Sequence, residues 1–435
     1  MTSRRRTSPY EMVENPVNNI GDWLGVGFWA VTDQGLFGVG NFILAAALAR
    51  WLSPVEYGSF AAAYSMLQLL AAIHAALFIE PMLVFGRGRF RVSFRRYLGA
   101  VVEGHWVFAA ITAAALIAAG AGIWVWNDRV FASSLFAFAL AGPFILLFWM
   151  TRRIFYALLE PHLAAAVSAA YTAVIVGLLY ALRSGGLLSA VSAPLAMGAA
   201  SALLAAITLS RLKVAAYGGC GVEQRRDIYT LHWRYGRWAV PTGALSWVPA
   251  NAYCLALPIV GGLEYTAAFS ALMTLVTPAQ QVISAVAGIL IPSFGQARQS
   301  GSMRRLVLLV LAGLSLGSAV YVALLGIAGE EVMWLLYGGR YAEYSHLAWI
   351  VGLVVIPSSV IAVLGSTLRV LERPDRVFWA YAASAAITWT AGMAATAHWH
   401  LTGAVVGQFI SYSATALVML WLLVAMPRSE YGRPA

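Results

Sequence analysis

Long apolar runs separated by short polar segments dominate the pattern of the chain. A helix rises about 1.5 Å per residue, so about 20 apolar residues cross the roughly 30 Å of hydrocarbon in a bilayer. Each run is long enough to satisfy its own backbone hydrogen bonds in lipid. The pattern therefore predicts an all-α polytopic membrane protein with about twelve transmembrane helices. We expect these helices at 24–50, 56–85, 98–124, 130–151, 163–182, 187–209, 238–260, 265–291, 306–328, 345–368, 377–396 and 402–425.

The basic residues fall almost entirely on one side of this arrangement. Of the 28 lysines and arginines, 24 lie in the tails and in every second connection, and four lie on the other side: Arg50, Arg129, Arg183 and Arg340. Cytoplasmic connections carry an excess of lysine and arginine. The distribution predicts a multi-pass protein with both termini in the cytoplasm. The polar start has no small-residue cleavage site, so we do not expect a removable signal peptide.

The longest basic connection lies at the middle of the chain and separates six spans from six. We therefore expect a cytoplasmic tail at 1–23, a first lobe at 24–210, a linker at 211–237, a second lobe at 238–425 and a tail at 426–435. Both lobes begin on the same side, so a repeat between them would be of the parallel type. A shift of 208 residues places Glu56-Tyr57 on Glu264-Tyr265, which supports such a repeat.

The composition agrees with the membrane interpretation and excludes several functions. Hydrophobic residues make up 61% of the chain and charged residues 11%, against about 25% charged in a typical soluble domain. This excludes a water-soluble enzyme and a nucleic-acid-binding domain. The two cysteines form neither a disulfide framework nor a metal-ligand pattern, and we find no phosphate-binding P-loop motif. We expect no metal, no cofactor and no enzymatic activity.

Two short motifs resemble those of a transporter family. The first is NFIL at 41–44 followed by LARWLSPVEYGSFA at 48–61, and the second is LLYGGRY at 335–341. Both resemble motifs of Wzx-type polysaccharide/oligosaccharide flippases, which belong to the multidrug/oligosaccharidyl-lipid/polysaccharide (MOP) exporter superfamily. Together with the twelve spans in two halves, the resemblance covers nearly the whole chain.

The resemblance implies a V-shaped, two-lobed transporter in the bacterial cytoplasmic (inner) membrane. It would move a polyprenyl-diphosphate-linked oligosaccharide repeat unit to the outer leaflet by alternating access, in exopolysaccharide, capsule or O-antigen synthesis. Its partners would be that lipid, the membrane lipids, and glycosyltransferases and a polysaccharide polymerase, with no nucleic acid, and it would be a monomer. The alternative on the same fold is a cation-coupled, multidrug-type antiporter of small molecules. A membrane enzyme is disfavoured because the outer loops are short.

Ionisable residues inside membrane spans are rare and are functional candidates by default. Asp33 lies nine residues into the first predicted span, and Gln34 and Asn41 accompany it on one polar flank. We predict that these three residues line the cavity or couple transport to an ion. The alternative is that Asp33 forms a structural hydrogen bond between helices.

Two further acidic residues extend this prediction. Glu80 precedes Pro81, which leaves a backbone carbonyl without its helical donor and so creates a candidate cation or proton site. It can equally be a kink stabilised by nearby arginines. Glu103 lies at a similar depth in the third span. With no nucleotide-binding motif in the chain, we expect a proton or sodium gradient to drive the cycle.

Arginine binds phosphate oxygens bidentately and is the preferred ligand for a diphosphate. Arg152 and Arg153 end the fourth span, and Arg369 ends the tenth, at comparable positions in the two halves. We predict that they receive the substrate anion, with ordinary contacts to anionic lipid as the alternative.

The seventh span contains three prolines around one asparagine. Pro241, Pro249, Asn251 and Pro258 predict a bent or discontinuous helix. Such breaks occur where protein or water satisfies the freed backbone groups. We predict that this segment is the hinge on which one lobe moves against the other.

Overall fold

A computed structural model describes residues 20–86, 88–126, 128–214 and 221–426, which form helices and no strands. The predicted tails at 1–23 and 426–435 therefore lie outside the described residues, except for residues 20–23 and 426. The all-α polytopic fold expected from the sequence is confirmed, because eleven helical segments are long and apolar enough to cross a membrane.

The first lobe contains six crossings. The second of these is one continuous rod in which the π-helix η2 joins two α-helices. The elements are α1 (Ile20–Trp51), α2 (Pro54–His74), η2 (Ala75–Ile79), α3 (Glu80–Phe85), α4 (Phe94–Val125), α5 (Arg129–Ala157), α6 (Pro161–Ser184) and α7 (Ser192–Arg211).

The second lobe repeats this order. Its elements are α8 (Val222–Val260), α9 (Leu263–Gln299), α10 (Met303–Tyr337), the 3-10 helix η3 (Ala342–Leu347), α11 (Ala348–Gly352), α12 (Val355–Val370), α13 (Pro374–Ile387), the π-helix η4 (Thr388–Gly392) and α14 (Met393–Val424).

The eleven segments make twelve crossings. The last segment, Pro374–Val424, has 51 residues, about 75 Å of helix and far more than a bilayer needs. Its backbone leaves the helical conformation at His400, where φ is 47° and ψ is −119°. Beyond this kink the chain runs back along itself, because Ser384 Oγ donates to the carbonyl oxygen of Ser411 at 2.7 Å. The expected count of twelve crossings is therefore confirmed.

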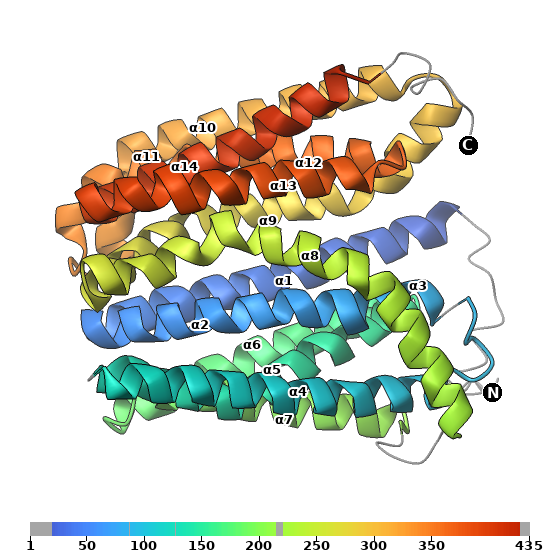
Figure 1. The fold of residues 1–435 in the computed structure, drawn as a ribbon, viewed down its shortest axis with the longest axis horizontal. Helices are drawn as coiled ribbons and strands as arrows, with labels where there is room; N and C mark the ends of the chain where they lie inside the picture. The colour runs from blue at the N-terminus through green and yellow to red at the C-terminus, as the bar shows by residue number, and fades with distance from the viewer. Residues whose placement is uncertain (1–19, 87, 127, 215–220, 427–435) are drawn as a thin grey trace, which may run out of the picture.

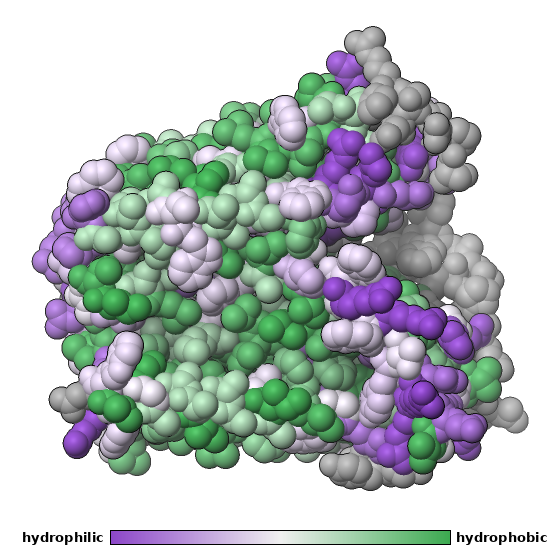
Figure 2. All heavy atoms as spheres, viewed as in Figure 1, coloured by the Kyte–Doolittle hydropathy of each residue, from purple (hydrophilic) through white to green (hydrophobic). Residues whose placement is uncertain are grey.

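We call the two ends of the bundle the basic end, where the connections after α3, α5, α7, α9 and α12 lie, and the opposite end, where the connections after α1, α4, α6, α8 and α10 lie. Helices α1 and α2 of the first lobe pack on α8 and α9 of the second (Figure 1). Figure 2 shows a hollow between the lobes at the basic end, edged by hydrophilic residues. The lobes thus diverge toward the basic end.

The apolar core has the same division. The larger cluster joins the first lobe to the half of the second lobe near the opposite end, through residues such as Leu44, Leu272 and Val351. A separate cluster lies in the basic half of the second lobe and includes Phe294 and Leu368. At the opposite end the two lobes therefore share a core, whereas at the basic end the start of α8 packs on the first lobe and the rest of the second lobe has its own cluster.

The second half of the expected linker at 211–237 is helical. Helix α8 begins at Val222 and continues for 39 residues to Val260, so residues 222–237 are helical. The sequence pattern missed this extension because it is polar and exceeds the hydrocarbon thickness. The polar part of α8 is stabilised by packing on the first lobe and not by an apolar run of its own.

Candidate functional site

Asp33 lies at the centre of a buried polar cluster inside the first lobe. Its Oδ2 accepts from Arg152 Nη1 of α5 at 2.8 Å and from the Tyr156 hydroxyl at 2.6 Å. Its Oδ1 accepts from Ser168 Oγ of α6 at 2.5 Å. Asp33 is fully buried and Arg152 is 4% exposed. The cluster joins α1, α5 and α6, which favours the structural alternative for Asp33.

The arginines at the end of α5 are engaged inside the lobe. The guanidinium of Arg152 also stacks on the ring of Phe37 at 4.0 Å. With the Gln34 amide oriented so that its oxygen faces Arg153, this oxygen accepts from both terminal nitrogens of Arg153 at 3.0 and 2.9 Å. Asn41 lies half-buried two turns further along α1. The structure thus brings four of the predicted residues together in two pairs, Asp33 with Arg152 and Gln34 with Arg153.

The amino-terminal part of α8 docks on the first lobe. Arg225 Nη1 donates to Glu103 Oε2 at 3.2 Å, and the Tyr229 hydroxyl donates to the carbonyl oxygen of Ala100 at 3.0 Å. Glu103 therefore fastens α8 to α4. It does not line a cavity with Asp33.

The carbonyl that Pro81 leaves without a helical donor is the one four residues earlier, on Leu77. His232 Nδ1 of α8 lies 2.8 Å from this oxygen and donates to it. Its Nε2 then accepts from the Tyr97 hydroxyl at 2.8 Å. The carbonyl oxygen of Leu77 therefore accepts a hydrogen bond from His232, a residue of the second half of the chain, in place of binding a cation.

Glu80 is exposed at the basic end of the second crossing. It lies beside Tyr235 of α8 and within electrostatic range of Arg369 on α12. Glu80 and Arg369 belong to different lobes, so their electrostatic interaction acts between the lobes at the basic end.

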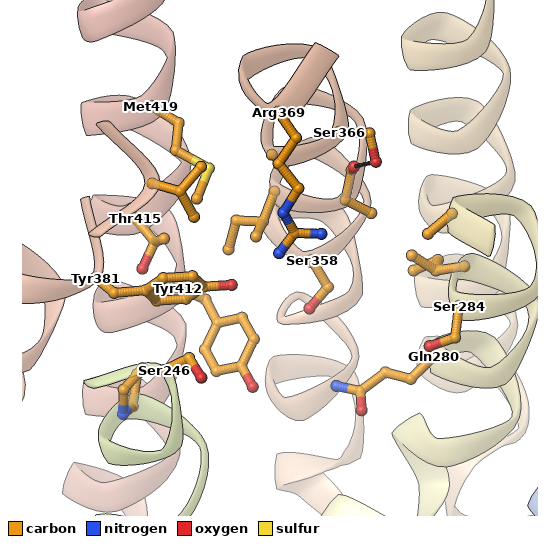
Figure 3. A pocket seen from close by; sticks show the side chains of 17 residues that line it. Ser246, Gln280, Ser284, Ser358, Ser366, Arg369, Tyr381, Tyr412, Thr415 and Met419 are labelled. Carbon is orange, nitrogen blue, oxygen red and sulfur yellow. Dashed lines mark hydrogen bonds between the residues drawn. The ribbon is translucent and has the colours of Figure 1, made fainter. Parts of the chain in front are cut away.

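The second lobe contains a cavity of about 320 Å³ between α8, α9, α12, α13 and α14. Arg369 supplies its one charged lining side chain and is exposed. In Figure 3 the guanidinium points into the cavity above Ser358, with Tyr381 and Tyr412 on one side and Ser284 on the other. The other lining residues are Ser246, Pro249, Gln280, Ile283, Ala287, Ile361, Ala362, Gly365, Ser366, Val377, Thr415 and Met419. Arg369 forms no ion pair with the described residues.

Most of these lining residues were missed by the sequence analysis. Gln280, Ser284, Tyr381 and Tyr412 are uncharged and lie on three different helices. The spacing along the chain relates only Gln280 and Ser284, which lie four residues apart on one face of α9. Only the basic side chain of Arg369 gave a signal, because intramembrane charge is rare.

The predicted hinge helix is bent but continuous. Figure 1 shows the bend of α8, which stays helical through Pro241, Pro249 and Pro258. Asn251 Nδ2 donates to the carbonyl oxygen of Trp247 at 3.4 Å, and Trp247 Nε1 donates to Ser65 of α2 at 2.9 Å. The helix therefore contacts both lobes along its length.

The two motifs at 48–61 and 335–341 meet at the opposite end. Arg50 Nη1 donates to the carbonyl oxygen of Leu335 at 2.8 Å, and Arg340 donates to the carbonyl oxygen of Leu52. A Cβ on Gly58 would lie 1.8 Å from the carbonyl oxygen of Leu263, so only glycine permits this approach of α2 to α9. Segments 285 residues apart thus hold the lobes together at this end.

In the described part of the chain, no group of three or more His, Cys, Asp or Glu side chains is placed to hold a metal ion. The polar groups that line the cavity are a guanidinium, hydroxyls and an amide. Such groups bind anions and neutral hydroxyl-rich molecules.

Comparison with known proteins gives the class of fold. No family model and no curated protein matches the sequence. Solved structures do match: an inward-facing multidrug resistance MATE family transporter of the MOP superfamily aligns with TM-score 0.68 and 13% identity over 90% of this chain and 94% of that chain.

Two other solved structures agree. An outward-facing MATE family transporter of the MOP superfamily has TM-score 0.64 and 12% identity, covering 96% and 98% of the two chains. A MOP superfamily transporter from Pyrococcus furiosus has TM-score 0.65 and 10% identity, covering 99% and 98%. At these identities the likeness shows the fold alone. The chain therefore has the MOP-superfamily fold, and the comparisons do not distinguish a flippase from a multidrug transporter.

Proposed function

We propose that the protein is a flippase that carries the anionic headgroup of a lipid-linked oligosaccharide across the cytoplasmic membrane by alternating access. The observation that carries this proposal is the second-lobe cavity, in which Arg369 is the one charged lining residue. A diphosphate headgroup presents oxygens that a guanidinium binds bidentately. The lipid tail would stay in the bilayer.

The sign of the charge favours an anion over a cation. A site for small amphipathic cations is expected to offer a carboxylate or an aromatic cage. Among the cavity's lining residues there is no carboxylate, and the positive charge of Arg369 would repel a cation from the aromatic rings of Tyr381 and Tyr412. Glu80 interacts electrostatically with Arg369, but it is not among the lining residues of the cavity and lies beside Tyr235. The cavity thus supports the flippase over the antiporter alternative.

The remaining lining groups suit a carbohydrate. Ser246, Gln280 and Ser358 offer donors and acceptors, and Tyr381 and Tyr412 offer aromatic faces with hydroxyl tips. Binding sites of this kind combine apolar walls with a few placed polar groups. Such a lining recognises sugar hydroxyls without fixing one sugar.

The arrangement of the lobes supports alternating access. The opposite end is closed by contacts such as Arg50 with Leu335, whereas the basic end is hollow. By the positive-inside rule the basic end, and both termini, face the cytoplasm. The matched fold has been solved in inward-facing and outward-facing conformations. The present conformation would then be the one that receives substrate from the cytoplasmic side.

The rest of the proposal concerns energy and partners. A proton or sodium gradient would drive the cycle, and the protein would act as a monomer beside glycosyltransferases and a polysaccharide polymerase. Of the residues predicted from sequence, we keep Arg369 as the anion ligand and α8, with its three prolines, as the hinge. We assign Arg152, paired with Asp33, to the structure of the first lobe.

The test is transport by the purified protein in proteoliposomes. One set of vesicles receives a fluorescent polyprenyl-diphosphate-linked glycan, and a parallel set receives a cationic dye. We expect protein-dependent movement of the glycan lipid and none of the dye. Movement of the dye alone would instead support the antiporter.

A further inference from the structure

Two histidine rings lie against each other in the interior of the first lobe. His74 Nε2 of α2 is 3.0 Å from His105 Nδ1 of α4, and the ring centroids are 5.1 Å apart. The two side chains are 1% and 0% exposed. Buried ionisable groups in membrane spans are functional candidates. No step described above uses this pair.

The outer nitrogens of the pair are without hydrogen-bond partners. His74 Nδ1 and His105 Nε2 are both buried, and neither makes a hydrogen bond, although the backbone of Pro143 lies beside the His105 ring. In a neutral pair, the shared N–H leaves one outer nitrogen protonated and the other with a bare lone pair. That bare nitrogen can accept one proton while the N–H···N bond remains. Asp33, by contrast, has both oxygens occupied.

The pair adjoins the place where α8 docks. The π-helix η2 begins directly after His74, and such single-turn insertions are frequent at functional sites. The ring of Phe78 contacts both His74 and His232 of α8, with centroids at 5.1 and 6.4 Å. A change of charge on the pair therefore acts on the helix that joins the two lobes.

The charged and titratable groups around the pair are few. On α4, Glu103 precedes His105 by two residues and is paired with Arg225 of α8. On the other side of Phe78, His232 is held by Tyr97 and by the backbone of Leu77. No carboxylate contacts either ring of the pair in the described residues. An added proton would thus be an uncompensated buried charge in this conformation.

We propose that the His74–His105 pair is the proton-binding site that couples the lobe movement to a proton gradient. This deepens the proposed function and rests on it for the direction of transport. The conformation that is open at the basic end holds the pair neutral. A proton taken up from the opposite side favours the alternative conformation, in which the pair is hydrated from that side. Return to the conformation open at the basic end expels the proton there, so one proton crosses the membrane in each cycle.

The experiment measures the opening of the basic end without any transported lipid. Spin labels are placed at Ser210 of α7 and at Ser300 beyond α9, which are exposed on the two lobes, with Cys220 and Cys254 replaced by Ser. We expect the label distance to shorten as the pH falls from 8 to 5. For a one-proton difference, the population ratio changes by up to about tenfold per pH unit.

The deciding comparison uses His74→Gln/His105→Gln and a matched control. Glutamine keeps hydrogen-bonding capacity but cannot take up a proton near neutral pH. We expect the acid-induced shift to vanish in this double variant and to persist in His162→Gln, which changes an exposed histidine of α6. A shift that persists in the double variant, or its absence from the unaltered protein, would overturn the proposal. Because no lipid is present, a failure here is distinct from a failure of the flippase assignment.

A second measurement covers the case in which the double variant does not fold. Nitrogen-15 spectra of the unaltered protein, labelled at histidine, report the protonation of each imidazole directly. We expect two resonances, assigned by the single variants H74Q and H105Q, to titrate together with the label distance. If neither imidazole gains a proton between pH 8 and 5, the proposal is overturned.

Discussion

Arg152 and Arg369 lie at matching places in the two lobes, each near the basic end of the fourth crossing of its half. Arg152 is buried and is paired with Asp33 at 2.8 Å. Arg369 is exposed, has no ion-pair partner among the described residues and points into a cavity. An arginine near the same end of the corresponding crossing is therefore structural in one lobe and open to a ligand in the other.

The difference comes from the neighbouring helices. In the first lobe, α1 brings a carboxylate to the arginine and α6 adds Ser168. In the second lobe, α8 brings Ser246 and Pro249 to the corresponding region, and neither neutralises a charge. A buried charge that loses its partner is strongly destabilising, whereas an exposed one remains solvated. Whether an intramembrane arginine is paired or open to a ligand therefore depends on side chains that are far away in the sequence.

The largest expected effect is on the stability of the first lobe. Asp33→Asn leaves the Arg152 guanidinium buried without its counter-ion, and we expect a loss of about 3–5 kcal/mol in the free energy of unfolding. Arg369→Gln, at the matching place, is expected to change stability by less than about 0.5 kcal/mol. Thermal unfolding of the purified variants in detergent measures both.

The double variant Asp33→Asn/Arg152→Gln is the control for charge burial. It removes both members of the pair and should recover much of the lost stability. If the Asp33→Asn protein were as stable as the unaltered one, Arg152 would not depend on a counter-ion, and the proposed difference between the two lobes would be contradicted.

Glycine substitutions compare the packing of the two lobes. A Cβ on Gly198 of α7 would lie 2.8 Å from that of Ala141 of α5, so Gly198→Ala is expected to cost about 1–3 kcal/mol. A Cβ on Gly365 meets nothing within 4 Å, so Gly365→Ala should be neutral or stabilising. Chemical denaturation measures both free energies. Equal losses of unfolding free energy would show that the second lobe is packed as tightly at Gly365 as the first lobe is at Gly198.

An acid placed beside Arg369 would make the second lobe resemble the first. Ser366 lies one turn before Arg369 and also lines the cavity. Ser366→Glu is expected to lower the transport of the anionic glycan lipid at least about tenfold, equivalent to 1.4 kcal/mol, because it neutralises the ligand site. Ser366→Gln, of similar size, should retain most of the activity. Equal transport by the two variants would show that the negative charge at position 366 does not cause the loss.

The smallest expected effect concerns the closed end, which keeps the cavity open to the basic side. Arg50→Gln or Arg340→Gln removes one hydrogen bond between the lobes. Both arginines are exposed, so each loss should shift the conformational balance by about 1 kcal/mol, or roughly fivefold. The distance between labels at Ser210 and Ser300 should shorten. An unchanged distance would mean that these contacts do not hold the conformation.

Much of the fold could be predicted from sequence because the bilayer imposes a length on each apolar run. The predicted spans agree with the helices. The main difference is in α8, which begins at Val222, before the span predicted at 238–260, because a polar helix continues outside the hydrocarbon. The hydropathy pattern carries no signal for a polar helix that is stabilised by contacts such as that of Arg225 with Glu103.

The site was harder to predict for a related reason. Asp33 and Arg369 were visible because charge is rare within a span, but their opposite environments depend on tertiary contacts. The pairing of His74 with His105 joins two spans, and the sequence does not show that these two histidines meet. The cavity is lined by residues of five helices, and the sequence does not show which faces of these helices meet.

The central claim is that Arg369 holds the anionic headgroup while the arginines near the end of α5, Arg152 and Arg153, do not. The most direct test is the rate at which a fluorescent polyprenyl-diphosphate-linked glycan crosses proteoliposomes containing Arg369→Gln, Arg369→Lys or Arg153→Gln. We predict a loss of at least about tenfold for Arg369→Gln, equivalent to 1.4 kcal/mol, partial activity for Arg369→Lys and little change for Arg153→Gln. Full transport by Arg369→Gln, with loss in Arg153→Gln, would contradict the account.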